Sequence, residues 1–428
     1  MSRKQGASAV RTKAGAEISE HRLKNGLRLL IARRHLDPVV AVMTWYNVGA
    51  RNELADEAGV SHFLEHMMFK GSKRFAKGEV DRRTTELGGS NNAFTTCDHT
   101  AYWFEFASDR WEHALEIEAD RMSNLTLDPV EFESEKQVVL EELSMGQDDP
   151  WRNLSQDVNE ALYGRHPYGR PIIGYADVLE RMTADDMRAY YKRFYHPGNA
   201  TIVLCGDVTK SAGLRAVRKH FAGIERGMDF ADADCFRPAE EEPKGERFLR
   251  VTWDDPASRL IMAWPAVSVG KDDDWNLDLV SALLTVGRTS RMHRRLVLEK
   301  GLATSIGTNN DCRVDRGSFW LYAEGAHGVA LADLQAELDA ELQRMADELV
   351  PAAELKRAKA MLDASEAHEG ETVSDLAEDI GGFAIDADWK MAIESSARRG
   401  RVTAKAIRDT VRRLLTKERR VVGWSEPR

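Results

Sequence analysis

The sequence repeats part of itself at a distance of about 220 residues. The segment LDPVEFESEKQVVLEEL at 127–143 is echoed by LVPAAELKRAKAMLDAS at 349–365, with Glu131 opposite Glu354. A fainter echo links GGSNNAFTTCDHTAYWFEFA in the first half to GTNNDCRVDRGSFWLYAEG in the second. Self-similarity of this kind predicts two halves of one fold, each a sheet with helices packed on it, although a match this short can also arise by chance.

An acidic stretch separates the two halves. The segment RGMDFADADCFRPAEEEPKGE, 226–246, carries two prolines and has no helical or strand period, which predicts a linker. We therefore expect a metal-binding first half at 15–225, for reasons given below, and a second half at 247–428. The expected fold class is α+β, built from two homologous α/β halves.

The charge balance argues against one broad class of partner. The chain has 60 lysines and arginines against 70 aspartates and glutamates, a formal net charge of −10. This balance does not fit a nucleic-acid binder and leaves no basic face for an anionic membrane. The sequence also lacks any apolar run long enough to predict a membrane-spanning helix.

Cysteine usage and the N-terminus bear on the compartment. The four cysteines lie far apart and form no CxxC pair, which fits reduced thiols rather than a disulfide framework. The first residues, MSRKQGASAVRTKAGAE, are basic but lack the apolar run of a signal peptide. We expect a cytoplasmic protein, or a periplasmic one if a leader has been removed.

The stretch GVSHFLEHMMFKGS, 59–72, places His62, Glu65 and His66 within five positions. In a helix these positions share one face, so both imidazoles can reach one zinc ion at about 2.0–2.1 Å. The plain alternative is a pair of polar residues on a half-buried helix. An apolar helix that offers one strip of ligand types is unfavourable unless the strip has a use, which favours the metal site. The apolar residues on the other side are Phe63, Leu64, Met67 and Met68.

A catalytic zinc ion needs a third protein ligand and an open position for water. Glu65 cannot easily be both a ligand and a base, so the third ligand must come from elsewhere. Unbound to the metal, Glu65 is the expected general base: it takes a proton from a water whose pKa zinc lowers to about 7 and passes it to the leaving amine. The predicted reaction is hydrolysis of a peptide bond.

The order HxxEH is the signature of inverted zincins. Together with GGSNNAFTTCDHTAY, ESEKQVVLEEL, HPYGRPIIG and YHPGNATIVLCGDV, in this order, it resembles the pitrilysin and insulysin family of metallopeptidases. The resemblance is to the branch of mitochondrial processing peptidase and its bacterial relatives, and it runs from about residue 22 to the end of the chain. It implies that each half is a mostly antiparallel sheet flanked by helices, and that the halves face each other as a clamshell.

The resemblance also implies roles for single residues. The third metal ligand of the family is a glutamate on a later helix, and Glu142 matches it. Glu135, two helical turns earlier, is implied to support the site from outside the ligand shell; a solvent-facing charge is the alternative, and it is our expectation for Glu141. The implied cofactor is one Zn²⁺ per chain, although two histidines and a glutamate often accept several divalent metals.

A substrate-binding strand is implied as well. In the family, the segment after the double glycine is an edge strand that pairs with the backbone of an extended peptide. The alternative is a turn into a core strand, and we favour it for Asn91. The residues that match the binding strand are Asn92, Ala93, Phe94 and Thr95.

The second half departs from the family at two positions. Relatives carry an arginine and a tyrosine that close over the substrate, whereas this sequence has Val297 and Thr304. Neither side chain can stabilise a developing oxyanion as those groups do. The departure predicts the metal-bearing subunit of a heterodimer whose other chain, of the same fold, supplies the arginine and tyrosine; a homodimer through the same surface is the other expected form. Alternatively, Arg288 or Arg291 replaces the missing groups.

The repeat places Ala358 and Ser365 opposite Glu135 and Glu142, so no metal site is expected in the second half. The expected function is a zinc endopeptidase that acts on unfolded or extended peptides. The alternatives are a non-catalytic structural or assembly subunit of the same fold and a metal-binding module without hydrolysis. The complete set of metal-site residues argues against the first alternative, and Glu65 as a free base argues against the second.

Overall fold

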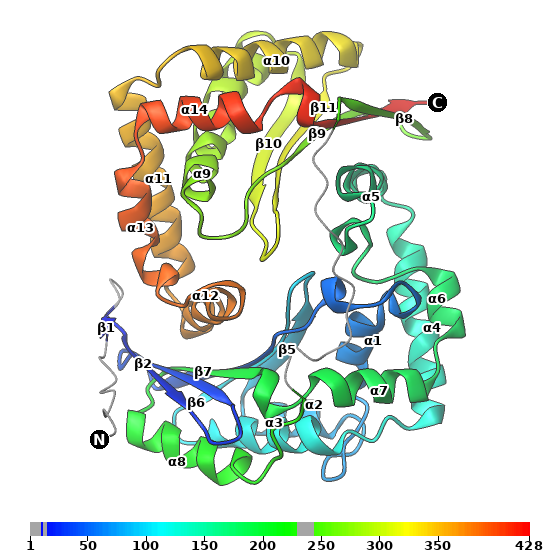
Figure 1. The fold of residues 1–428 in the computed structure, drawn as a ribbon, viewed down its shortest axis with the longest axis vertical. Helices are drawn as coiled ribbons and strands as arrows, with labels where there is room; N and C mark the ends of the chain where they lie inside the picture. The colour runs from blue at the N-terminus through cyan, green and yellow to red at the C-terminus, as the bar shows by residue number, and fades with distance from the viewer. Residues whose placement is uncertain (1–9, 12–14, 229–243) are drawn as a thin grey trace. The chain divides into compact units, whose positions relative to one another are not determined.

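The computed structural model describes residues 10–11, 15–228 and 244–428, so residues 229–243 of the expected linker lie outside the described part (Figure 1). The chain forms two compact units that interleave in sequence. The halves expected at 15–225 and 247–428 are each contiguous, whereas each unit takes in one segment from the other half. Unit 1 comprises Met1–Leu143, Pro171–Phe236 and Ala367–Ile393, and unit 2 comprises Ser144–Arg170, Arg237–Glu366 and Glu394–Arg428.

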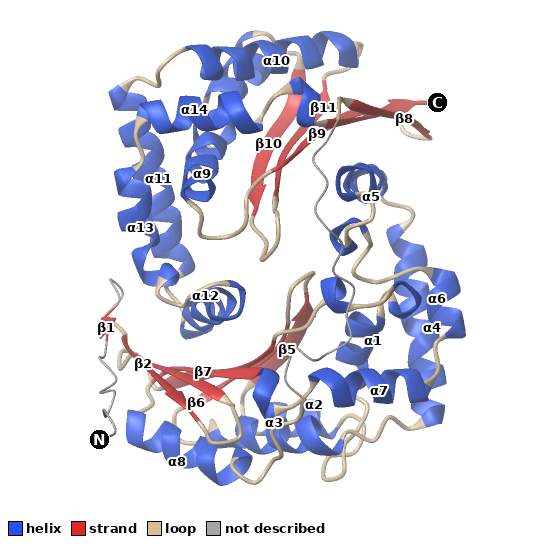
Figure 2. Ribbon diagram, in the orientation of Figure 1, coloured by secondary structure: helices blue, strands red, loops and turns tan. Residues whose placement is uncertain are grey.

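Unit 1 is built on a seven-stranded sheet in the order β1-β2-β3-β7-β4-β6-β5. Figure 2 draws its strands in red. Strands β3 and β7 run parallel, and the other neighbouring strands run antiparallel. Strand β5 lies at one edge and pairs only with β6 in the sheet as described. The strands are β1 (Val10–Arg11), β2 (Glu17–Arg22), β3 (Arg28–Arg33), β4 (Val39–Tyr46), β5 (Ser90–Thr95), β6 (Thr100–Ala107) and β7 (Ala200–Gly206).

Strand β4 is buried on both faces, which explains its nearly continuous apolar sequence VVAVMTWY. Val42 and Tyr46 belong to the larger core, which includes residues of the helices below the sheet in Figure 1. Met43 and Trp45 point the other way, into a core shared with the helix α12 (Val373–Asp386). Successive strand residues alternate between faces, so each face of β4 carries its own apolar set.

Unit 2 repeats the same plan with five strands in the order β10-β11-β9-β12-β8. Reading β8, β12, β9, β11 and β10 as the counterparts of β3, β7, β4, β6 and β5 gives the same neighbours throughout, including one parallel pair, β8 with β12. The prediction of two similar halves, each a mostly antiparallel sheet with flanking helices, is confirmed. The strands are β8 (Arg247–Trp253), β9 (Ser258–Pro265), β10 (Ala303–Asp311), β11 (Ser318–Gly325) and β12 (Val421–Pro427).

The two halves exchange one helix each. Helix α12, from the C-terminal half, packs on β4 and β7 of unit 1, and α5 (Pro150–Tyr163), from the N-terminal half, packs on β9 and β12 of unit 2. Glycines permit both close contacts: a side chain at Gly381 would meet the Trp45 ring at 2.2 Å, and one at Gly423 would meet Val158 at 2.6 Å. The exchange explains why the compact units interleave in sequence.

The remaining helices flank these sheets. Among the described residues, none of the helices combines the length and apolar character that crossing a bilayer requires. The helices associated with unit 1 are α1 (Val60–Met67), α2 (Glu79–Glu86), α3 (Glu112–Asn124), α4 (Pro129–Gly146), α6 (Ala176–Arg181), α7 (Ala184–Phe194) and α8 (Lys210–Phe221). Those associated with unit 2 are α9 (Asp272–Thr285), α10 (Leu331–Asp347), α11 (Ala352–Glu369), α13 (Met391–Arg401) and α14 (Ala404–Leu414).

Candidate active site

Helix α1 carries the HxxEH motif and is fixed at its N-terminus. The buried Glu53 carboxylate accepts hydrogen bonds from the backbone N–H groups of Gly59 and Ser61, both at 2.9 Å. Gly59 has φ of +97°, and a side chain there would meet the carbonyl oxygen of Ile173 at 2.5 Å. Because an anion at a helix N-terminus satisfies free N–H groups, Glu53 caps the motif helix and sets its starting point.

The apolar face of α1 packs against α4. Phe63 and Leu64 are fully buried, and the Phe63 ring lies 4.7 Å from the ring of Phe132 on α4. On α4, Phe132, Glu135 and Val139 follow the helical spacing of a buried face. The packing of these two helices brings their polar faces together.

The structure brings the three predicted metal ligands together. Oε2 of Glu142 lies 3.8 Å from Nε2 of His62 and 3.6 Å from Nε2 of His66, and one ligand atom from each residue lies within 4.8 Å of the others. Two atoms bound to one tetrahedral zinc ion are roughly 3.3 Å apart, so the set fits the ion with small adjustments. The side chains are 15%, 23% and 45% exposed, so a ligand or water can reach them.

Glu65 lies beside the ligand group and is held by β5. Its Oε2 accepts a hydrogen bond of 2.5 Å from the Thr95 hydroxyl, at the end of the strand. Burial raises the pKa of Glu65 above its ordinary value, and the hydrogen bond from Thr95 opposes that rise. A carboxyl group in this environment, outside the ligand set, has the surroundings expected of a general base.

Glu135 lies beside the candidate ligands, and the supporting role that the resemblance implies stays a prediction. Its Oε1 accepts a hydrogen bond from Nδ1 of His66 at 3.0 Å, and its Oε2 lies 2.5 Å from the ammonium group of Lys70. Burial pushes the pKa of Glu135 up, but the hydrogen bonds from Lys70 and His66 outweigh it, so its pKa lies below the ordinary value. Sequence reasoning missed Lys70, which lies after the end of α1 and meets Glu135 only through the packing of that segment against α4.

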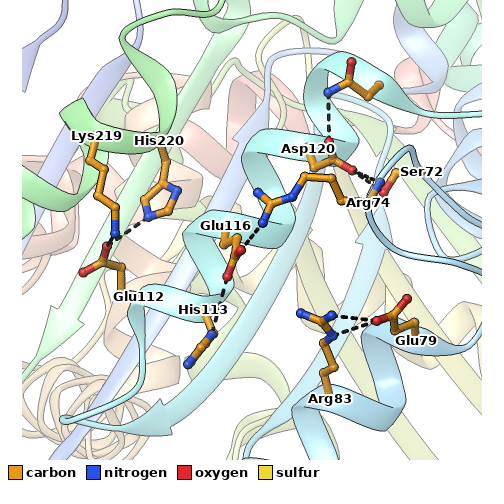
Figure 3. A network of polar contacts seen from close by, with 11 residues as sticks. Ser72, Arg74, Glu79, Arg83, Glu112, His113, Glu116, Asp120, Lys219 and His220 are labelled. Atoms are coloured by element: carbon orange, nitrogen blue, oxygen red, sulfur yellow. Dashed lines mark hydrogen bonds and ion pairs between the residues drawn. The ribbon is translucent and has the colours of Figure 1, made fainter.

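A polar network fixes the chain that follows α1. The Asp120 carboxylate on α3 accepts hydrogen bonds from the Ser72 hydroxyl at 2.7 Å and from the backbone N–H of Arg74 at 2.9 Å (Figure 3). Asn124 donates to the other oxygen of Asp120 at 2.9 Å. Because Ser72 lies two residues after Lys70, this network holds the segment from which Lys70 reaches Glu135.

The predicted substrate strand is an edge strand rather than a turn into the core. Within β5, the Asn92 side chain accepts a hydrogen bond from the Ala93 N–H at 2.9 Å, and Phe94 packs edge-on against Trp45 at 5.6 Å. The Thr95 hydroxyl donates a hydrogen bond to Glu65, so this end of β5 lies next to the candidate general base. Substrate binding by these four residues remains a prediction.

In the second half, Val297 and Thr304 have local roles. Val297 is partly buried against the apolar core of unit 2, and the Thr304 hydroxyl donates to Oε1 of Glu324 at 2.8 Å. Arg291, an alternative clamp in the sequence prediction, forms a two-point ion pair with Glu354 at 2.7 and 2.8 Å. Any catalytic use of Arg291 therefore requires this pair to break.

A second group of metal-ligating side chain types occurs among the described residues, in unit 2. Asp274, Asp278 and Cys312 lie together, but the Asn310 amide donates hydrogen bonds to both carboxylates, at 2.8 and 2.9 Å. The Cys312 thiol donates to the same oxygen of Asp274 at 2.6 Å. These groups satisfy one another through hydrogen bonds.

Known proteins are similar to this chain in sequence and in fold. Residues 28–176 match the family model described as insulinase (peptidase family M16), and residues 181–362 match the model described as peptidase M16 inactive domain. The zinc protease PqqE of Helicobacter pylori (strain ATCC 700392 / 26695) is 30% identical over 371 residues, which are 86% of this chain and 83% of PqqE. The chain belongs to peptidase family M16.

Further M16 relatives agree with this membership. The zinc protease YmxG of Bacillus subtilis (strain 168) is 27% identical over 348 residues, 81% of this chain and 83% of the relative. The crystal structure of a protease from Helicobacter pylori has a TM-score of 0.92 and 26% identity, and the match covers 96% of this chain and 100% of that one. Both sequence relatives are named zinc proteases.

Proposed function

We propose that this M16 chain is a zinc endopeptidase that hydrolyses unfolded or extended peptides. The observation that carries the proposal is the convergence of His62, His66 and Glu142 from two helices, with Glu65 outside the ligand set. A structural subunit has no use for a complete ligand set beside a separately held carboxylate. The role of metal-bearing subunit in a two-chain peptidase is part of the proposal.

His62, His66 and Glu142 would hold the zinc ion, with the imidazole Nε2 atoms facing it. When bound, zinc lowers the pKa of a water and polarises the scissile carbonyl. Glu65 takes the proton of the attacking water and returns it to the amine that leaves. Thr95 holds one oxygen of Glu65, so the other oxygen is left to meet the water.

The proposed binding site for the substrate is the edge strand β5. A peptide that adds to β5 as a further strand binds through its backbone, so it must be extended but need not have one sequence. The Ala93 N–H is now bonded to the Asn92 side chain, and an incoming strand would compete for it. A folded domain has no free strand to offer, so we expect it to be a poor substrate.

The first experiment asks whether the chain is a zinc-dependent base catalyst. An unstructured peptide is incubated with the purified protein and zinc, and with the variants Glu65→Gln and His62→Ala. We expect Glu65→Gln to keep zinc and lose about 10³-fold in rate, because a positioned general base contributes about 10²–10⁴-fold. His62→Ala should lose zinc itself. Near-normal turnover by Glu65→Gln would remove the assigned base.

The second experiment concerns the partner. The chain has Val297 and Thr304 in place of two groups that stabilise negative charge, and removing one such donor lowers a rate by about 10²–10³. The isolated chain should therefore be weak, and a second chain of the same fold with an arginine and a tyrosine at these positions should restore activity. Full activity alone, lost on Arg288→Ala, would point to a replacement within this chain.

A further inference from the structure

Lys70 reaches the metal site through one intermediate. Its ammonium group lies 2.5 Å from Oε2 of Glu135, and Oε1 of the same carboxylate accepts from Nδ1 of His66 at 3.0 Å. The Glu135 side chain is 8% exposed and that of Lys70 is 24% exposed, so this chain of contacts is mostly shielded from water. Nε2 of His66 is the atom that faces Glu142.

The orientation of a glutamate carboxylate is not fixed by its own rotamer. The terminal torsion of glutamate is broad, so hydrogen bonds set the plane of the carboxylate. Each oxygen of Glu135 has one partner. Oε1 binds His66, a proposed metal ligand, and Oε2 binds Lys70, which is not a ligand. With Oε2 anchored by Lys70, Oε1 stays directed at the His66 N–H.

This orientation matters for zinc because it fixes His66. A histidine that donates one ring N–H to a carboxylate presents the lone pair of its other nitrogen to the metal in a set direction. We propose that Lys70 is a positioning residue for zinc: through Glu135 it holds His66 in the ligating geometry. The proposal rests on the metal site of the proposed function and adds a residue beyond the HxxEH motif.

A competing effect has the opposite sign. A positive charge close to a bound dication repels it, so loss of the lysine charge alone would tighten zinc binding. Lys70 is in direct contact with the Glu135 carboxylate, which largely cancels its charge at a distance. We therefore expect the loss of orientation to dominate, and the direction of the change in affinity distinguishes the two effects.

The protein contains a matched control. Lys77 binds Glu131 at the same distance of 2.5 Å, and Glu131 lies on α4 one turn before Glu135. Both pairs join the segment after α1 to the same helix. Glu131 is not paired with a metal ligand in the way Glu135 is, so Lys77→Met removes a more exposed ion pair of the same length without the link to His66.

The experiment measures the zinc dissociation constant by competition with a chromophoric chelator. Lys70→Met should weaken zinc binding about tenfold, the lower end of the effect of residues behind metal ligands. Lys77→Met should stay within about twofold of the parent, as surface substitutions do. Lys70→Arg should restore most of the affinity. Unchanged or tighter binding by Lys70→Met overturns the proposal.

A double substitution tests the route. In a Glu135→Gln background, Lys70→Met should change the zinc affinity much less than in the parent, because Glu135, the residue that links Lys70 to His66, is already altered. Equal effects in the two backgrounds would mean that Lys70 acts by another path and would overturn the proposal. Thermal unfolding of the zinc-free proteins controls for folding, and Lys70→Gln replaces Lys70→Met if that variant does not fold. If the parent protein binds no zinc, the proposed function itself is overturned. If the parent and Lys70→Met bind zinc equally tightly, only the proposed role of Lys70 is removed.

Discussion

In each unit a threonine of the edge strand is hydrogen-bonded to a neighbouring helix, at different places along the strand and with different partner groups. In unit 1, helix α1 and edge strand β5 meet where the Thr95 hydroxyl donates to Glu65. In unit 2, helix α9 and edge strand β10 meet where the Thr308 hydroxyl lies 2.9 Å from the Ser281 hydroxyl and 2.6 Å from the Thr285 hydroxyl. A threonine of the edge strand is bonded to the helix in both, but only unit 1 offers a carboxylate. The repeated fold therefore does not determine the chemistry, which depends on a few side chains.

Helices α4 and α11 repeat this difference. Both have 18 residues, and the repeat aligns them residue by residue. Glu135 and Glu142 of α4 belong to the proposed metal site, whereas Ala358 and Ser365 occupy the matching places on α11. The description of residues 181–362 as an inactive domain fits this loss. The second half has kept the helix and lost its ligands.

One feature of these helices is common to both. Glu131 at the start of α4 pairs with Lys77, and Glu354 at the start of α11 pairs with Arg291. The aligned glutamates thus have a structural role in each half, independent of any metal. This is why the repeat was visible in the sequence at Glu131 although the ligand positions had diverged.

The largest expected effect comes from giving α4 the residue that α11 has at the matching position. Glu142→Ser introduces the serine found at position 365 and should weaken zinc binding by at least about 100-fold, since a ligand is lost outright. The neighbouring exposed Glu141 is the control, and Glu141→Ser should leave zinc affinity unchanged. The measurement is chelator competition. If both variants bind zinc equally well, Glu142 is not the third ligand.

The group of Asp274, Asp278 and Cys312 in unit 2 provides the next test. Burial, with Asp274 nearby, raises the pKa of Asp278 to about 6. The native state therefore keeps a proton that the unfolded chain releases near pH 4, so this group makes stability fall as the pH rises from about 4 to 6, with no further change above. Asp278→Asn should stabilise the protein by about 2 kcal/mol above pH 6 and remove this fall.

The measurement for Asp278→Asn is the unfolding temperature of the zinc-free protein between pH 4 and 8. Asp272→Asn, on the exposed first turn of the same helix, is the control. The plots of unfolding temperature against pH for the parent and for Asp278→Asn should differ mainly above pH 6. A loss of stability above pH 6 would mean that the Asp278 carboxylate is needed as a charge, and the cluster would then resemble the metal site more than its hydrogen bonds indicate.

Much of the fold and the grouping of the candidate ligands could be predicted from sequence because the signals were local. His62, Glu65 and His66 share one helical turn, and the helical pattern around Glu135 and Glu142 places both on one face. The exchange of α5 and α12 could not be predicted in this way. Amphipathic patterns indicate that a helix has a buried face, but they do not say which sheet covers it.

The residues that the sequence missed or misplaced act across elements. Lys70 has no distinctive pattern, and its link to Glu135 depends on the packing of α1 against α4. Thr95 was expected only to bind substrate, because its strand was compared with a binding strand. Its bond to Glu65 depends on where β5 ends relative to α1, which no spacing within either segment specifies.

The smallest expected effect separates those two roles of Thr95. Thr95→Val keeps the shape and removes the donor, so the positioned base loses one hydrogen bond of about 1.5 kcal/mol, and kcat should fall about tenfold with KM nearly unchanged. Thr95→Ser should restore kcat because the hydroxyl returns. Thr308→Val makes the same change at the threonine contact between β10 and α9 of unit 2, where the bonded groups are the Ser281 and Thr285 hydroxyls, and should leave kcat unaltered. Zinc affinity should be the same in all three, since Thr95 contacts the base and not a ligand. A rise in KM with kcat unchanged would instead assign Thr95 to substrate binding, and the difference between the two edge strands would then lie in the peptide that one of them holds.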